Sequence, residues 1–146
     1  MTVATILKSK GSIGSKVHTI HSDVSVEEAT RQLRELHVGA LVATNDGGNI
    51  AGVFSERDLV RAVTTDGAAA LSQPISSFMT RAVVTASLSD TMDDIMASMT
   101  SRRIRHLPVV DEGKLIGIIS IGDIVKAKIA ESEFEAKALK DYISAG

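Results

Sequence analysis

The chain has 146 residues, a formal net charge of −2 and a hydrophobic share of 44% in which aromatic residues are scarce, with three Phe, one Tyr and no Trp. The charge argues against broad nucleic-acid binding, which needs a basic face, and the absence of cysteine excludes disulfides and thiolate catalysis. No apolar run could cross a bilayer, and residues 1–10 lack the apolar core of a signal peptide, so we expect a cytoplasmic protein without a membrane partner.

In the first half of the chain the hydrophobic pattern predicts five elements in the order strand, helix, strand, strand, helix. The turn Asp46-Gly47-Gly48-Asn49 is typical of a hairpin and joins the second and third strands. The predicted elements are a strand at 17–20, a helix opened by the capping box Ser25-x-x-Glu28, strands at 40–44 and 50–55, and a helix at about 56–64.

The second half repeats this order after a short helix predicted at 71–80, with Pro74 near its first turn. A charged helix continues to residue 143, with apolar contacts at Ile129, Phe134, Leu139, Tyr142 and Ile143. The repeated elements are a strand at 83–86, a helix from about Asp90 with Met92, Ile95, Met96 and Met99 inward, strands at 105–110 and 115–120, and a helix from Ile121.

The pattern Gly-x-x-Ser-x-x-Asp occurs twice, at residues 52–58 and 117–123, each time after an apolar run and before a helix. One β-α-β-β-α repeat is too small to cover both faces of its own sheet. We therefore expect an α/β (α+β) fold in which two repeats, related by a pseudo-twofold axis, pack as one module. The expected divisions are an N-terminal segment at 1–16, repeats at 17–66 and 83–130, a linker helix at 67–82 and a C-terminal helix at 131–146.

Three stretches resemble the signatures of the cystathionine-β-synthase (CBS) domain family, in which two domains in tandem form a Bateman module. They are Ile104-Arg105-His106-Leu107-Pro108-Val109-Val110-Asp111, Gly-Lys-Leu-Ile-Gly-Ile-Ile-Ser at 113–120, and Ser55-Glu56-Arg57-Asp58. The likeness covers about residues 5–130, and it is greatest to small stand-alone bacterial proteins made of one such pair.

The resemblance implies a regulatory module that senses energy or redox state, with no catalysis of its own. It implies an adenine nucleotide in the clefts between the repeats, with AMP first and NAD or ATP as the other candidates. It also implies a homodimer, formed as a flat disc through the helices, that acts on an unknown target protein.

Asp58 and Asp123 are the ribose candidates, because a carboxylate can accept hydrogen bonds from both hydroxyls of a ribose diol. Ser55 and Ser120 are the phosphate candidates. Ser-x-x-Asp is also a helix-capping arrangement, and a serine hydroxyl can cap a helix while it donates to phosphate. Capping and nucleotide binding therefore both remain open from the residues alone.

Positive charge for a phosphate comes from Arg57 beside the first motif and from Arg105 or His106 before the second. Arg102 and Arg103 fit equally well as solvated residues at a helix end. Gly39-Ala40 stands in the first repeat where Arg105-His106 stands in the second, so the two clefts are expected to differ.

The resemblance also assigns walls for an adenine ring. At the Asp123 cleft they are Lys16, Val17, His18, Val38 and Gly39, and at the Asp58 cleft they are Thr80, Ala82, Val84 and Ile104. Gly39 also fits a turn that ends the preceding helix.

Other chemistry has weaker support in the sequence. His18 and His21 point to opposite faces of a predicted strand with no pair of carboxylates to complete a metal site, so no metal is expected. The stretch 117–122 has one residue too many before Ser120 for a hydrolase nucleophile elbow, and the Gly-rich stretch 11–16 lacks the spacing of a phosphate loop. The alternative to a nucleotide-binding regulator is a structural or interaction protein that acts through dimerisation or partner docking with no physiological nucleotide.

Overall fold

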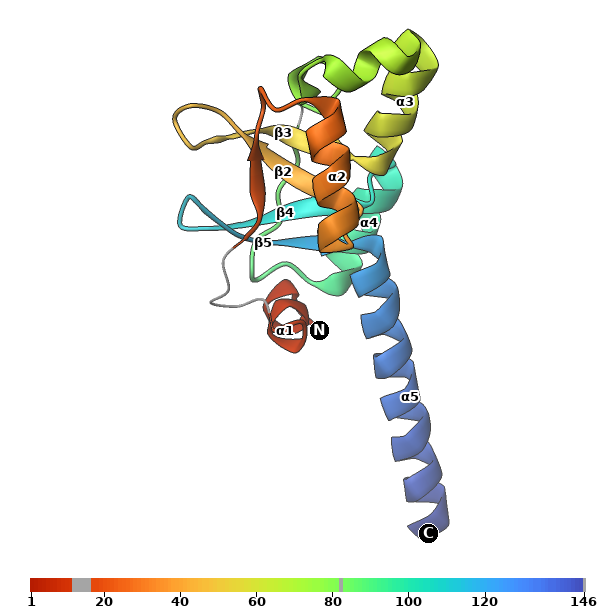
Figure 1. The fold of residues 1–146 in the computed structure, drawn as a ribbon. Coiled ribbons are helices and arrows are strands. Elements are labelled where there is room, and N and C mark those ends of the chain that lie inside the picture. Colours follow the sequence, from red (N-terminus) through yellow and green to blue (C-terminus); the bar gives the residue numbers. More distant parts are fainter. Residues whose placement is uncertain (12–16, 82, 146) are drawn as a thin grey trace. The chain divides into compact units, whose positions relative to one another are not determined.

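The structure is a computed structural model that describes residues 1–11, 17–81 and 83–145. The chain divides into two compact units (Figure 1). We call Val17–Val84 the central unit, and Met1–Lys16 together with Thr85–Gly146 the terminal unit. The fold is mixed α/β, as the sequence predicted. Among the described residues, no helix is both long and apolar enough to cross a membrane.

The central unit follows the predicted order of elements. Its sheet has the strand order β1-β2-β3, in which β1 runs parallel to β2 and β2 runs antiparallel to β3. The elements are β1 (Thr19–His21), α2 (Val26–Leu36), β2 (Ala40–Thr44), β3 (Ile50–Ser55) and α3 (Glu56–Asp66), followed by the 3₁₀ helices η1 (Gly67–Ser72) and η2 (Ile75–Ser77).

Helix α2 covers the core of this unit with an apolar stripe in which Val26, Ala29 and Leu33 are buried. Its N-cap Ser25 accepts the Glu28 N–H at 3.2 Å, whereas the Glu28 carboxylate turns to Arg31, so the capping box is only half formed. Burial of the stripe against the sheet is the main favourable term for such a helix. The core cluster comprises Ile20, Val26, Ala29, Leu33, Leu41, Ala43, Phe54, Ile75 and Met79.

The linker differs from the single helix predicted at 71–80. Gln73 and Pro74 both have extended backbone, with ψ 154° and 148°, because the proline ring disfavours the helical conformation of the residue before it. Ile75 is fully buried and its N–H donates to the Val24 carbonyl at 2.9 Å. The linker is therefore part of the central unit. It forms the two short 3₁₀ helices η1 and η2 and is joined to the unit by backbone hydrogen bonds.

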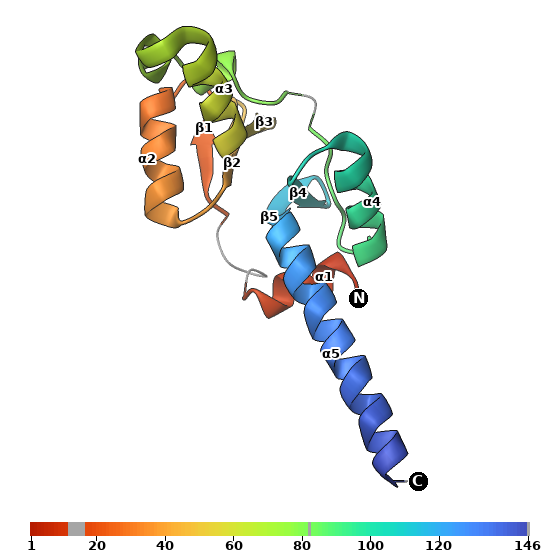
Figure 2. The ribbon, with the colours of Figure 1, turned by 90° about the vertical axis from the view of Figure 1, so that its right-hand side faces the viewer.

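The terminal unit combines both ends of the chain. Its strands β4 and β5 form an antiparallel pair. The predicted strand at 83–86 is reduced to one parallel bridge between Ala86 and Val109. The elements are α1 (Val3–Ser9), α4 (Met92–Arg102), β4 (His106–Asp111), β5 (Lys114–Ser120) and α5 (Ile121–Ala145) (Figure 2).

Helix α1 was not predicted, and it fills the core of the terminal unit. Val3 and Leu7 are fully buried, and the Val3 N–H donates to the Asp90 carbonyl at 2.9 Å. Helix α4 buries three of its four predicted inward residues, but Met96 is 36% exposed.

The glycine that begins each motif permits a close approach. A Cβ on Gly52 would lie 2.6 Å from the Thr80 carbonyl oxygen, and one on Gly117 would lie 3.1 Å from a methyl group of Leu7. Thr80 also exchanges two backbone hydrogen bonds of 2.9 Å with Val53. The equivalent strands β3 and β5 are thus flanked by different segments, an extended chain in one unit and a helix in the other.

Candidate functional site

The two Ser-x-x-Asp motifs lie where a strand ends and a helix begins, as predicted. We call Ser55–Asp58 the first corner and Ser120–Asp123 the second corner. The first belongs to the central unit at the start of α3, and the second belongs to the terminal unit at the start of α5. Both corners cap their helices, so the capping role that the sequence left open is present in both repeats.

At the second corner the capping box is reciprocal. The Asp123 N–H donates to Ser120 Oγ at 3.1 Å, and the Ser120 N–H donates to Asp123 Oδ2 at 2.9 Å. Lys10, just beyond α1, donates from Nζ to the same Oδ2 at 2.8 Å and to the Ile118 carbonyl at 3.0 Å. The two hydrogen bonds that the carboxylate accepts, from the Ser120 N–H and from Lys10, both end on Oδ2, and the Asp123 side chain remains 19% exposed.

The Asp123 carboxyl is held in its ionised form. Burial alone would raise its pKa, but the hydrogen bonds from Lys10 and from the Ser120 N–H, together with the Lys10 charge, outweigh burial and lower the pKa below the usual value. An ionised carboxylate at a helix start, reached from solvent, is a suitable acceptor for hydroxyl groups.

At the first corner the carboxylate is more enclosed. Asp58 Oδ2 accepts the Ser55 N–H at 2.8 Å and the Ser55 hydroxyl at 3.1 Å, and Oδ1 accepts from Arg61 Nη2 at 3.0 Å. Arg61 also donates to the Phe78 carbonyl, and the Asp58 side chain is only 5% exposed. A ribose at Asp58 would have to displace Arg61, so the two corners offer unequal sites.

The predicted phosphate-binding residues lie at or near the corners. Arg57 is exposed in the first turn of α3. The Arg105 carbonyl accepts the Ile121 N–H at 2.8 Å, and His106 pairs with Ser120 in the sheet, so both residues adjoin the second corner. Arg102 and Arg103 lie at the C-terminal end of α4, where basic side chains complement a helix dipole.

The predicted adenine walls are divided between the units. Val17, His18, Val38, Gly39, Thr80 and Val84 belong to the central unit, Ile104 belongs to the terminal unit, and Lys16 and Ala82 lie outside the described residues. Gly39 follows the αL residue His37 that ends α2, and its carbonyl accepts the Glu56 N–H at 3.0 Å. Gly39 therefore meets the first corner of its own unit, in the place that Arg105 holds at the second.

A pocket of about 470 Å³ lies beside this loop, between α2 and α3 of the central unit. Sequence reasoning had singled out only two of its lining residues, Val38 and Gly39, as site residues. The others are Thr30, Leu33, Arg34, His37, Glu56 and Leu59.

Sequence reasoning also missed Lys10 and Arg61 as partners of the two aspartates. Arg61 was within reach of prediction, because residues three apart on a helix are neighbours. Lys10 was not, because it lies 113 residues from Asp123 and no helix was expected before it.

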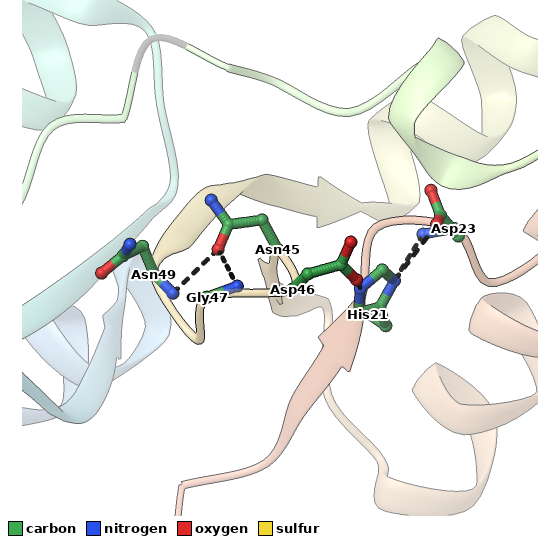
Figure 3. Close-up of polar contacts among 6 residues, drawn as sticks. All are labelled: His21, Asp23, Asn45, Asp46, Gly47 and Asn49. Carbon is green, nitrogen blue, oxygen red and sulfur yellow. Dashed lines mark hydrogen bonds and ion pairs between the residues drawn. The ribbon is translucent and has the colours of Figure 1, made fainter.

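A third polar cluster joins the end of β1 to the β2–β3 turn (Figure 3). His21 Nε2 lies 2.7 Å from Asp46 Oδ1, and His21 Nδ1 accepts the Asp23 N–H at 3.1 Å with the Asp23 carboxylate 3.7 Å away. Asn45 Oδ1 accepts the Gly47 and Asn49 N–H groups and so fixes the turn that presents Asp46.

The cluster brings together one histidine and two carboxylates, whereas the sequence predicted no pair of carboxylates beside His21. With Nδ1 accepting a backbone N–H, the ring proton lies on Nε2 and is donated to Asp46. An ion bound at either ring nitrogen would break one of these bonds, and both carboxylates are exposed. The cluster acts as a hydrogen-bonded link between the strand and the turn.

Comparison with known proteins agrees with this architecture. The chain is 33% identical over 150 residues to the mitochondrial CBS domain-containing protein CBSX3 of Arabidopsis thaliana, an alignment that covers 99% of this chain and 73% of that protein. Among solved structures, the CBS-domain protein ATU1752 from Agrobacterium tumefaciens is 46% identical with a TM-score of 0.82 and covers 87% of this chain and 92% of its own.

A more distant structure carries a nucleotide. The CBS domain protein PAE2072 from Pyrobaculum aerophilum, complexed with AMP, is 25% identical with a TM-score of 0.72 and covers 84% of this chain and 89% of its own. The family model of the CBS domain matches this chain twice, at residues 11–65 and 75–130. The chain therefore belongs to the CBS-domain family and carries two CBS domains in tandem.

Proposed function

We propose that the chain is a regulatory module that binds an adenine nucleotide, AMP first among the candidates, with the ribose at Asp123 of the second corner. The observation that carries this proposal is the state of the Asp123 carboxylate, which is ionised, fixed by its capping box and partly exposed to solvent. The AMP complex of PAE2072 supports the ligand class. The protein then acts by binding and carries out no reaction of its own.

The first corner is the weaker site in this proposal. Both oxygens of Asp58 are already bonded and its side chain is nearly inaccessible, so its role is chiefly to cap α3. We propose one nucleotide per chain at low concentration, held at the second corner, with phosphate contacts from Ser120 and from Arg105 or His106. The equivalent set at the first corner, Ser55 and Arg57 with Asp58, would bind more weakly.

Lys10 gives the nucleotide a way to change the protein. A ribose diol held by both carboxylate oxygens would meet Lys10 at Asp123 Oδ2, so ligand and Lys10 compete for that oxygen. Displacement of Lys10 also releases its bond to the Ile118 carbonyl and loosens the end of α1. A ligand shifts a two-state protein only by its difference in affinity for the states, and this competition supplies such a difference. A target protein would read the position of α1.

Titration calorimetry with AMP, ADP, ATP, NAD and S-adenosylmethionine tests the proposal. We expect saturable binding of at least one of them near one per chain, loss of that binding in Asp123→Asn, and retention in Asp94→Asn. Asp94 is a matched control because it forms the same capping box with Thr91 at the start of α4, a helix that begins at neither corner. Equal loss in both variants would show that capping, and not ligand contact, is what Asp123 contributes.

Competition by Lys10 predicts a gain in affinity when that residue is removed. An exposed ion pair is worth up to about 1 kcal/mol, so Lys10→Met should bind nucleotide about two- to fivefold more tightly. Weaker binding in Lys10→Met would instead make Lys10 a phosphate ligand and contradict the competition.

A structural or interaction protein is the second candidate function. It is favoured by the exposed apolar residues that the two repeats share at equivalent positions, Val60 on α3 and Val125 on α5, which fit a homodimer formed through the helices. No binding of any nucleotide in the calorimetric panel, with a stable dimer in sedimentation, would support this function over nucleotide sensing.

A further inference from the structure

Helix α5 is 25 residues long, but only its first turns pack against the terminal unit. Ile124 is buried and Ala127 and Glu131 are partly covered, whereas every described residue from Ser132 onward is exposed. In both views the C-terminal half of the helix extends beyond the other elements of the terminal unit (Figures 1 and 2).

An apolar stripe follows the side of α5 that does not pack. Val125, Ile129, Leu139 and Ile143 are 50%, 54%, 61% and 68% exposed. At about 100° per residue they fall, with two small residues, within an arc of about 80°. We call this set the α5 stripe, and its members are Val125, Ile129, Ser132, Ala136, Leu139 and Ile143.

The spacing of the α5 stripe alternates between four and three residues, which is the a/d spacing of a coiled coil. Ile129, Ala136 and Ile143 take the a positions, and Val125, Ser132 and Leu139 take the d positions. Ile at a with Leu at d favours two-stranded coils. A solitary helical segment without packing is marginal in water, so this half of α5 needs a partner that covers the stripe.

The charges beside the stripe select the partner and its direction. The charged g positions are Lys128 and Glu135, and the e positions are Lys126, Glu133 and Lys140. In a parallel coil each g residue faces the following e residue of the other helix, so Lys128 would meet a glutamate and Glu135 would meet a lysine. Within one chain, Lys128 lies only loosely paired, 3.8 Å from Glu131.

The antiparallel arrangement of the same stripe is disfavoured. With a and d positions facing each other, e residues face e residues, so Glu133 would meet Glu133 and Lys126 would meet Lys140. The g residue Glu135 would also meet its own copy. Like charges that face each other cost stability and act against a wrong pairing.

From the spacing and the charges we propose that the α5 stripe binds a second copy of this chain in a parallel two-stranded coiled coil. The pairing does not depend on nucleotide binding, so it can stand or fall separately from the proposed function. It would place the two second corners of a dimer at the same end of one coil.

Single-cysteine crosslinking of the intact 146-residue chain tests this pairing, because that chain has no cysteine. Leu139→Cys puts a thiol at a d position that faces itself only in a parallel, in-register coil. Phe134→Cys is the matched control, since Phe134 is 75% exposed on the opposite side of the same helix. Under mild oxidation without nucleotide, we expect Leu139→Cys to crosslink on the order of a hundredfold faster than the control, as millimolar effective concentration exceeds micromolar protein.

Charge reversal gives a second test that leaves the stripe intact. The double variant Lys128→Glu with Lys140→Glu should weaken self-association in sedimentation, because all four facing positions become acidic. Adding Glu133→Lys and Glu135→Lys exchanges the charges and should restore it. Equal crosslinking at positions 139 and 134, or self-association that is unchanged by the double reversal, would overturn the proposal.

Discussion

At the residue scale, Asp58 and Asp123 are equivalent in the repeat but differ in what holds them. Asp58 accepts three hydrogen bonds in a nearly closed environment, so Asp58→Asn should lower the free energy of unfolding by about 1–3 kcal/mol. Urea unfolding measures this loss. Asp94→Asn, which removes an exposed capping carboxylate, should cost less, and an equal cost for the two variants would contradict the importance of the Arg61 and Ser55 contacts.

The Lys10–Asp123 pair makes a prediction about pH. The folded pKa of Asp123 lies below its unfolded value, so the carboxylate contributes stability that is complete above the unfolded pKa and is lost as the pH falls through the folded pKa. Lys10→Met removes a main cause of the lowered pKa. Wild type should therefore be more stable than Lys10→Met above about pH 4, and the difference should vanish in more acidic solution. Thermal melting from pH 2 to 7 checks this.

If the difference in melting temperature between wild type and Lys10→Met stays constant down to the lowest pH, Lys10 stabilises the protein by packing of its aliphatic stem. The control is Glu131→Gln, which removes a carboxylate that lies 3.8 Å from Lys128. Because this ion pair is long and exposed, the melting temperature of the control should stay close to that of wild type at every pH.

Sequence reasoning found the two aspartates because a capping motif is local. Ser-x-x-Asp specifies hydrogen bonds among residues three apart, and those bonds are present at both corners. The cation that each aspartate pairs with was not predicted. Lys10 meets Asp123 only through the packing of α1, and Asp46 meets His21 only because the β2–β3 turn folds back past β1.

At the scale of elements, the two motif glycines should respond differently to the same substitution. A methyl group on Gly52 would strike the Thr80 backbone oxygen at 2.6 Å, whereas one on Gly117 would meet a terminal methyl group of the Leu7 side chain at 3.1 Å. Overpacking costs about 1–3 kcal/mol where the neighbour cannot move. Gly52→Ala should therefore be clearly the more destabilising in urea unfolding, and the reverse order would show that Thr80 yields more easily than Leu7.

Elements were predictable where the pattern was strong and the flanking turn was explicit. Strands β2 and β3 have the expected bounds, because the Asp46–Asn49 turn fixes where the hairpin reverses. Helix α1 was missed, because seven residues without an acidic first turn give little periodic signal. The strand expected at 83–86 forms only the Ala86 bridge, since a short β-branched run becomes a strand only where a neighbour offers a full edge.

At the scale of the whole molecule, the two repeats are similar in sequence, but the segments outside the repeats that contact them are different. The Val53 carbonyl accepts the Thr80 N–H, while its equivalent, the Ile118 carbonyl, accepts from the Lys10 ammonium. Two similar domains thus acquire unequal corners, one closed by Arg61 and one shared with α1. The sequence alone showed that the corners must differ, but not which of them stays open.

This asymmetry predicts how nucleotide should act on the whole chain. A ligand that binds only the folded protein adds about 2.7 kcal/mol of stability at a hundred times its dissociation constant, so the melting temperature should rise with the logarithm of AMP concentration. Asp58→Asn should show the same rise from a lower starting temperature, and Asp123→Asn should show none.

If the ribose displaces Lys10 from Asp123, hydrogen exchange at the end of α1 should become faster with AMP, although the melting temperature of the protein rises. Slower exchange throughout α1 would mean that the nucleotide binds without displacing Lys10 and that α1 carries no signal.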